Sequence, residues 1–156
     1  DRGLPWLWDM PGSTRTLLTD GGVTRDLLYC PSNPHQNDDV LWNWNWYKVL
    51  GYYWLWETTG RQPNLILRSG NGYLVKGYIQ RAGTPGGSDL ELITDATISS
   101  GGNFMAVGGG WSRPHRTAHT HDNQPEGGNV VYLDGHGEWR PFDEMELQAN
   151  GPQQWF

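Results

Sequence analysis

The clearest alternation of apolar and polar positions lies in the last third of the chain. Residues 129–133 form a run rich in β-branched and aromatic side chains, Asp134-Gly135 follows it directly, and residues 138–140 resume the pattern. Such runs favour strands, and Asp-Gly between two of them is a strong signal for a tight turn. The pattern therefore predicts a β-hairpin with Asp134 and His136 at its tip.

Shorter apolar runs, bounded by glycine, proline or polar residues, predict further strands. In residues 42–47 tryptophan alternates with asparagine, and a period of two places Trp42, Trp44 and Trp46 on one face of a strand. We expect this strand to pair with residues 52–56. The remaining predicted strands are residues 27–30 (or a buried turn), 65–67, 73–79, 90–94 with Asp95 at its end, and 103–107.

Helical signals are few. Residues 13–20 suit a short helix that Ser13 or Thr14 caps and Gly21-Gly22 ends, and residues 143–149 suit one further helical turn. The 22 glycines and 10 prolines favour turns and short strands over long helices. We therefore expect a mostly β to α+β fold: an antiparallel sheet with one or two short helices, in a single globular domain spanning residues 1–156.

The charge argues against nucleic-acid binding, and the cysteine content excludes an intrachain disulfide. The net charge is −6 and the 11 lysines and arginines are scattered, so the chain has no basic surface to neutralise phosphates and nucleic-acid binding is not expected. The chain contains one cysteine, Cys30, which rules out an intrachain disulfide. We interpret Cys30 as a small core residue.

Candidate metal ligands cluster around the predicted hairpin. His119 and His121 are two residues apart, which in a strand places both imidazoles on one face at about 6.6 Å. Asp134 and His136 have the same spacing, and Asp95 ends a neighbouring strand. These five residues suggest one divalent ion: zinc if the histidines bind it, calcium if the carboxylates and carbonyl oxygens do. The alternative is that Asp134 only serves the turn and the histidines are solvated.

Ten tryptophans are more than a core of this size easily absorbs, because a buried indole N–H needs a partner. A row of indoles on a strand face can stack on sugar rings or contact a partner subunit. The alternative is core packing. The candidates for carbohydrate or partner binding are Trp42, Trp44, Trp46, Trp54, Trp56 and Trp111.

Three segments far apart in the chain carry a family resemblance. They are residues 28–32 (Leu-Tyr-Cys-Pro-Ser), 90–96 (Leu-Glu-Leu-Ile-Thr-Asp-Ala) and 128–139, with Asp134-Gly135. In this order they resemble the signature of prepilin-type proteins, in which a histidine, a nine-residue spacer and Asp-Gly stand near the C-terminus. Here twelve residues separate His121 from Asp134, and the turn at 122–126 takes up the added length.

The resemblance implies the globular head of a pilin-like or type II secretion pseudopilin-like subunit. Such a head is a structural, non-catalytic part of a periplasmic or cell-surface filament, and its partners are other filament subunits. Prepilin-type proteins normally begin with a hydrophobic helix, so contact with the membrane is expected only through a helix absent from this chain. The longest apolar-aromatic run, residues 52–56, is far short of the roughly 20 residues that cross a bilayer.

Two alternatives come from other functional classes. The first is a carbohydrate-binding module that binds polysaccharide through exposed tryptophans. The second is a small metal-dependent enzyme, because His119-Thr120-His121 followed by Glu126 is similar to half of the cupin metal motif. Pro125 would interrupt the strand which that motif needs, and its second half is absent.

Overall fold

The computed structural model of the chain describes residues 7–44, 47–55, 65–69, 72–76, 91–109, 112–149 and 153–156, and at residues 65–69, 72–76, 148 and 149 it describes the backbone alone. Within these residues the fold is mostly β, with antiparallel sheets and two α-helices. This confirms the expected fold class.

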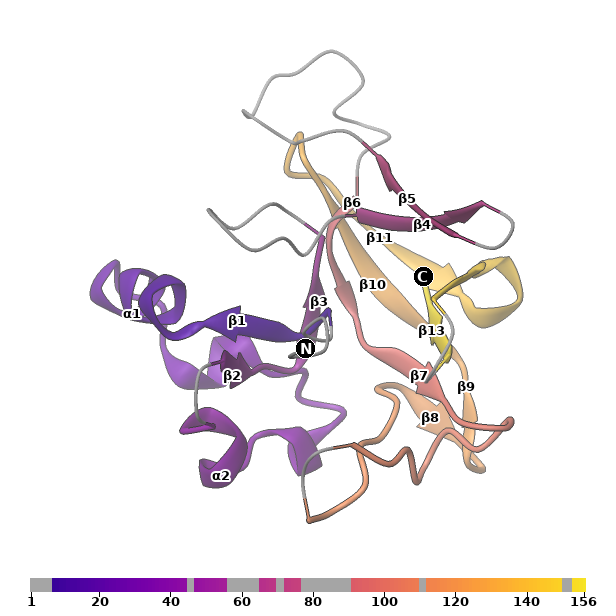
Figure 1. Cartoon of the computed structure of the whole chain (residues 1–156), viewed down its shortest axis with the longest axis horizontal. Coiled ribbons are helices and arrows are strands. Elements are labelled where there is room, and N and C mark those ends of the chain that lie inside the picture. Colours follow the sequence, from indigo (N-terminus) through magenta and orange to yellow (C-terminus); the bar gives the residue numbers. More distant parts are fainter. Residues whose placement is uncertain are drawn as a thin grey trace.

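A four-stranded antiparallel sheet forms the centre of the described structure (Figure 1). The predicted hairpin at its edge is confirmed, and the Asp134 side chain accepts a hydrogen bond from the backbone N–H of His136 in the turn, at 3.0 Å. The next strand inward ends at Asp95 and is paired on both sides, as a buried strand should be. The order of the strands is β11 (Gly137–Pro141), β10 (Gly127–Tyr132), β6 (Glu91–Asp95) and β3 (Tyr52–Trp54).

The N-terminal third lies to one side of this sheet (Figure 1). Its two short strands, β1 (Asp9–Pro11) and β2 (Tyr47–Val49), pair with each other in an antiparallel ribbon. Four helical segments surround the ribbon. They are α1 (Gly12–Asp20), η1 (Arg25–Leu28), η2 (Pro34–Gln36) and α2 (Asp39–Trp42).

The C-terminal segment returns to pair with the strand that follows β6. This second sheet is antiparallel, in the order β12 (Leu147–Ala149), β13 (Gln153–Trp155) and β7 (Thr97–Ser99). Two small hairpins complete the described strands: β4 (Leu65–Ser69) with β5 (Gly72–Lys76), and β8 (Thr120–His121) with β9 (Gln124–Pro125). The first of these confirms the predicted strands 65–67 and 73–79 over their described residues.

Two clusters of buried apolar side chains hold these parts together. The larger joins the N-terminal segment, β3, β7 and the C-terminus, and includes Trp8, Tyr53, Ile98 and Phe156. The second joins η1 to β3 and consists of Met10, Leu28, Tyr29, Leu50 and Trp54. Burying one large apolar side chain contributes about 1.5–3 kcal/mol. The loop after η1 is thereby packed firmly against the central sheet.

The predicted strand of alternating tryptophan and asparagine is wrong. Residues Asp39–Trp42 form α2, because the side chain of Asp38 accepts a hydrogen bond from the backbone N–H two residues on, at 2.8 Å, and caps the helix. The following strand begins at Tyr47 and pairs with β1 instead of β3. Trp42 and Trp44 therefore do not lie on a common strand face.

Three smaller predictions are also corrected. Helix α1 ends at Gly21 as expected, but it begins after Pro11 and no side chain caps it. Residues 103–107 form bends with isolated bridges, because the side chain of Asn103 accepts hydrogen bonds from two backbone N–H groups that a strand would use. The helical turn expected at 143–149 is η4 (Phe142–Glu144), and strand β12 follows it.

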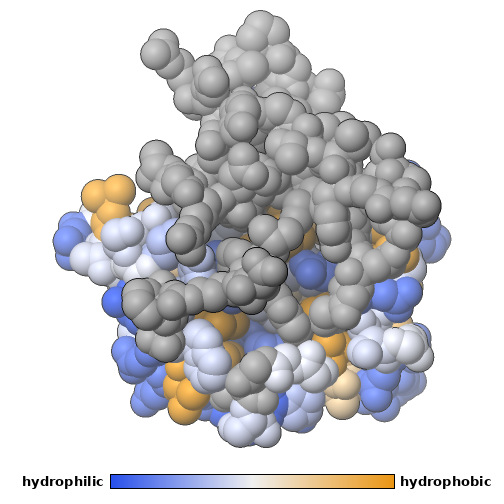
Figure 2. All heavy atoms as spheres, in the orientation of Figure 1, coloured by the Kyte–Doolittle hydropathy of each residue, from blue (hydrophilic) through white to orange (hydrophobic). Residues whose placement is uncertain are grey.

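The two α-helices of the described residues are 9 and 4 residues long. None of the helices there is long and apolar enough to cross a bilayer. On the face shown in Figure 2, the described residues present mostly hydrophilic side chains, and the hydrophobic ones occur in small separate groups.

Candidate metal centre

Three side chains that can bind a metal converge where β6 ends. They are Cys30, Asp95 and His119, and one ligand atom from each lies within 4.8 Å of the other two. Nε2 of His119 lies 3.0 Å from Oδ2 of Asp95 and 3.3 Å from Sγ of Cys30. Cys30 and Asp95 are buried and His119 is half-buried. The structure thus brings together two of the predicted metal ligands and adds a thiol.

The sheet fixes the carboxylate of Asp95 in one orientation. Asp95 is the last residue of β6, opposite Tyr52 of β3. Its Oδ2 accepts two hydrogen bonds from Asn129 of β10, from the backbone N–H at 2.8 Å and from the side-chain amide at 2.7 Å. Gly128 leaves room for this approach, because a Cβ atom there would lie 3.0 Å from Cβ of Asp95.

An unusual backbone conformation turns His119 toward this carboxylate. Its φ is +47°, in the left-handed region that residues other than glycine seldom adopt. The backbone N–H of His119 donates to Oγ of Ser32 at 3.0 Å, and its carbonyl accepts from Glu126 at 2.9 Å. The His119 ring also packs edge-on against Trp139, with 5.0 Å between ring centroids. These contacts hold the imidazole in place.

Cys30 reaches the site because the chain passes close to β3 at a glycine. A Cβ atom at Gly51 would lie 2.6 Å from Cα of Tyr29 and 2.9 Å from the backbone nitrogen of Cys30, a distance no side chain tolerates. Oγ of Ser32 lies 3.0 Å from Sγ of Cys30. Ser32 therefore contacts both the thiol and the backbone of His119.

The charges and hydrogen bonds of Cys30 and Asp95 are compatible with a bound cation. Burial raises the pKa of the Cys30 thiol to about 11, and the Asp95 carboxylate adds to the rise. The Asp95 side chain is 1% exposed, and its Oδ1 has no hydrogen-bond partner among the described residues. Within that part of the chain, His119 is the one basic side chain at ion-pair distance from this carboxylate. A buried carboxylate with an unpartnered oxygen has unused capacity to bind a positive charge.

The same residue types form nucleophilic triads, but this geometry is different. In a triad the imidazole faces the nucleophile with one ring nitrogen and the carboxylate with the other. Here Nε2 of His119 faces both Sγ of Cys30 and Oδ2 of Asp95. A thiol with a raised pKa is also a poor nucleophile. Three ligand atoms within 4.8 Å of one another suit a bound cation instead.

The other predicted metal ligands lie outside this cluster. The His121 side chain is 76% exposed, with Nδ1 3.6 Å from the carboxylate of Asp122. His119 lies in a bend before β8 with a φ of +47°, so the two histidines do not share a strand face as expected. Asp134 and His136 contact each other at 2.6 Å in the hairpin turn, about 16 Å along the strand from Asn129.

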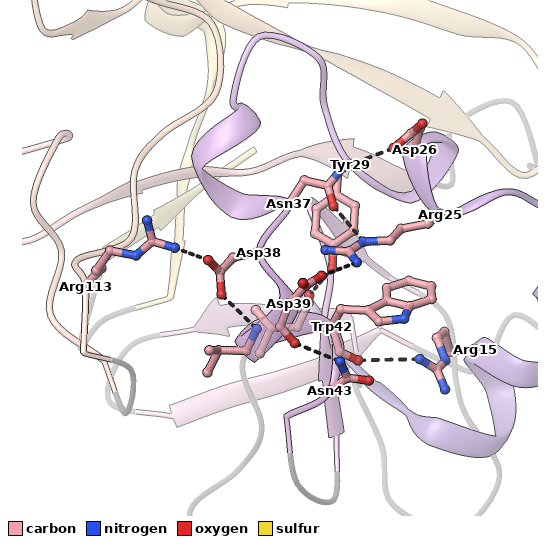
Figure 3. A network of polar contacts seen from close by, with 12 residues as sticks. Arg15, Arg25, Asp26, Tyr29, Asn37, Asp38, Asp39, Trp42, Asn43 and Arg113 are labelled. Atoms are coloured by element: carbon pink, nitrogen blue, oxygen red, sulfur yellow. Dashed lines mark hydrogen bonds and ion pairs between the residues drawn. The ribbon is translucent and has the colours of Figure 1, made fainter.

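The structure gives the tryptophan candidates different surroundings. The guanidinium carbons of Arg15 and Arg25 lie 4.5 Å and 5.2 Å from the centroid of the Trp42 ring (Figure 3). The Trp42 ring is therefore engaged in cation–π contacts within the chain. Trp54 is buried in the core. Trp44 is 36% exposed and keeps a surface available for a ligand. The remaining candidates, Trp46, Trp56 and Trp111, lie outside the described residues.

Comparison with known proteins returned nothing. No protein-family model, curated protein or solved structure matches this chain. The resemblance to prepilin-type proteins therefore rests on the three segments themselves. Residues of all three segments meet at the end of β6: Asn129 donates to Asp95, and Cys30 and Ser32 contact His119.

The sequence did not identify Cys30 or Asn129 as part of the site. Cys30 and His119 are 89 residues apart, and no spacing rule links positions at that distance. The available signal was that Cys30 and Asn129 both lie in segments that carry the family resemblance. His119 lies in none of those segments, so the resemblance alone does not select the cluster.

Proposed function

We propose that this chain is the non-catalytic head of a pilin-like or pseudopilin-like subunit, which assembles with other such subunits into a periplasmic or cell-surface filament. The observation that carries the proposal is that residues of the three resembling segments, among them Cys30, Asp95 and Asn129, meet at the end of β6. Independent chance matches would not be expected to meet in space. Segments that meet are more readily explained as the structural signature of one fold.

The contacts of the cluster suit a structural function. They tie the loop after η1 to the end of β6 and to β10, so that the N-terminal third and the C-terminal hairpin are fixed to each other. A filament subunit acts by packing against its neighbours and needs a rigid head for that purpose. The ring-nitrogen geometry of His119 offers no relay for nucleophilic chemistry.

A divalent ion, calcium or zinc, is part of the proposal. Cys30, Asp95 and His119 would hold it where the three segments meet. There the ion would add a cross-link between parts of the chain that are distant in sequence, and binding free energy would become folding stability.

The complete precursor tests the assembly proposal. It is expected to carry a hydrophobic helix before the present residue 1 and, when produced together with a filament-assembly system, to appear in a sheared, pelletable surface fraction. The matched control is the same precursor with two charged residues placed in the helix, which should stay out of that fraction. A precursor that has no such helix, or that never pellets, would contradict the proposal.

Carbohydrate binding is the second candidate, and two exposed indoles favour it. Trp44 is 36% exposed and Trp139, on the edge strand β11, is 45% exposed. Retention on insoluble polysaccharide that Trp44→Ala or Trp139→Ala abolishes would support a binding module over a filament subunit. Leu17→Ala, at another exposed apolar residue, is the control and should leave retention unchanged.

A further inference from the structure

We infer that Cys30, Asp95 and His119 bind one zinc ion, through the Cys30 thiolate, Nε2 of His119 and a carboxylate oxygen of Asp95, with a fourth position open to water. This inference rests on the structural-ion part of the proposed function and not on filament assembly. A sulfur, nitrogen and oxygen donor set is typical of zinc, whereas calcium takes six to eight oxygen ligands.

The spacing of the donors fits a tetrahedral ion. Zinc–ligand bonds of about 2.0–2.3 Å place neighbouring donors roughly 3.3–3.8 Å apart. The observed distances from Nε2 of His119 are 3.3 Å to Sγ of Cys30 and 3.0 Å to Oδ2 of Asp95. Nε2 of His119 would therefore move away from each of these two atoms by only about a few tenths of an ångström to admit zinc, and the ligand atoms of Cys30 and Asp95 lie within 4.8 Å of each other.

The charges also favour zinc over calcium. When zinc binds, the proton of the Cys30 thiol passes to solvent, and one thiolate and one carboxylate then balance the charge of the ion. A neutral assembly is the form that burial favours at a site where Cys30 and Asp95 are both inaccessible. Calcium would leave the thiol protonated and would find a single carboxylate.

The groups around the three ligands orient them for this purpose. Asn129 donates two hydrogen bonds to Asp95, and Ser32 contacts both Cys30 and the backbone N–H of His119. Partners of this kind orient metal ligands, and losing one typically weakens metal binding by about 10–100-fold. Asp95 keeps spare capacity because its Oδ1 lacks a hydrogen-bond partner among the described residues.

A cobalt titration of the chelator-treated chain tests the inference directly. Co²⁺ is expected to bind at one equivalent and to produce the absorption band of sulfur-to-cobalt charge transfer. Zn²⁺ should displace it and remove the band, while Ca²⁺ should not. These measurements use the wild-type chain, so they do not depend on any variant folding.

Variants then assign the ligands. Cys30→Ala should abolish the band and weaken zinc binding by more than about 100-fold, beyond the loss from a surrounding residue such as Asn129→Ala. His121→Ala removes an exposed imidazole next to the site and should change neither measurement. Circular dichroism checks that each variant is folded.

Three results would overturn the zinc site. They are the absence of Co²⁺ and Zn²⁺ binding to the wild-type chain, stoichiometric binding without a sulfur band, and tighter binding of Ca²⁺ than of Zn²⁺. A precursor that fails to form filaments while its head binds cobalt through sulfur would overturn the assembly proposal and leave the zinc site standing.

Discussion

Nε2 of His119 lies 3.0 Å from Oδ2 of Asp95, although the two residues are 24 positions apart and His119 lies outside the sheet that Asp95 belongs to, in the bend before β8. The same nitrogen lies 3.3 Å from the thiol of Cys30, in the N-terminal third. One imidazole therefore joins the N-terminal loop to the end of the central sheet. Stability, metal binding and the response to substitution should all depend on this point of contact.

Zinc should stabilise the wild-type chain. A ligand that binds the folded state at 100 times its Kd adds about 2.7 kcal/mol to the free energy of unfolding. We expect the urea midpoint of the chelator-treated protein to rise on addition of zinc, and the rise to be lost in Cys30→Ala and kept in His121→Ala. An equal rise in Cys30→Ala would show that zinc binds elsewhere.

Asp95→Asn should destabilise the chain even without metal. The amide loses the negative charge beside His119 and can no longer accept both hydrogen bonds from Asn129 as well as a carboxylate does, at a cost of about 1–3 kcal/mol. Urea unfolding in the presence of a chelator measures the effect. Asp122→Asn, at an exposed residue, is the control and should stay within about 0.5 kcal/mol of wild type.

Gly51→Ala should destabilise the fold and displace Cys30. The added Cβ would lie 2.6 Å from Cα of Tyr29, so backbone must move, which typically costs about 1–3 kcal/mol or more. Gly108→Ala is the matched control, because a Cβ there meets no atom within 4 Å. If both variants have the same free energy of unfolding, the close approach at Gly51 does not determine the position of Cys30.

His115 should make the chain less stable as the pH falls. Burial, and to a lesser degree the charge of His35, lower the pKa of His115 from 6.5 to about 4 in the folded state. The ring is packed against Trp8 and contacts Gln36, and it is 4% exposed. Between these two pKa values the unfolded chain binds more protons than the folded chain, so stability present above pH 6.5 is lost toward pH 4, by about 3 kcal/mol.

The comparison with His115→Gln isolates this contribution. Free energies of unfolding are measured between pH 4 and 8 with a chelator present, for wild type and the variant. The difference between them should shrink steadily as the pH falls from about 6.5 to 4. A difference that is constant over this range would show that His115 is not buried in its neutral form.

The parts of the fold that follow from local pattern could be predicted from the sequence. The run at 129–133 and the following Asp-Gly define the β10–β11 hairpin, and the apolar run ending at Asp95 defines β6, because each signal lies within a few neighbouring residues. The strand predicted at 42–47 was wrong because the alternation of tryptophan and asparagine does not reveal that Asp38 caps helix α2, which includes Trp42.

The candidate site depends on features that a pattern does not contain. The left-handed conformation of His119 separates it from His121, and it is held by Ser32 and Glu126 from other parts of the chain. Cys30 joins the site through tertiary packing across Gly51. The sequence therefore indicates Asp95 and His119 only as residue types that suit a metal. Their contact with Cys30 follows from the tertiary structure.

The most direct test of the account is X-ray absorption at the zinc edge, on the chain loaded with one equivalent of zinc. We predict one sulfur at about 2.3 Å and nitrogen or oxygen neighbours at about 2.0–2.2 Å, with the sulfur missing in Cys30→Ala. A shell made only of nitrogen and oxygen in the wild-type protein would contradict the assignment of Cys30, Asp95 and His119 as the zinc site.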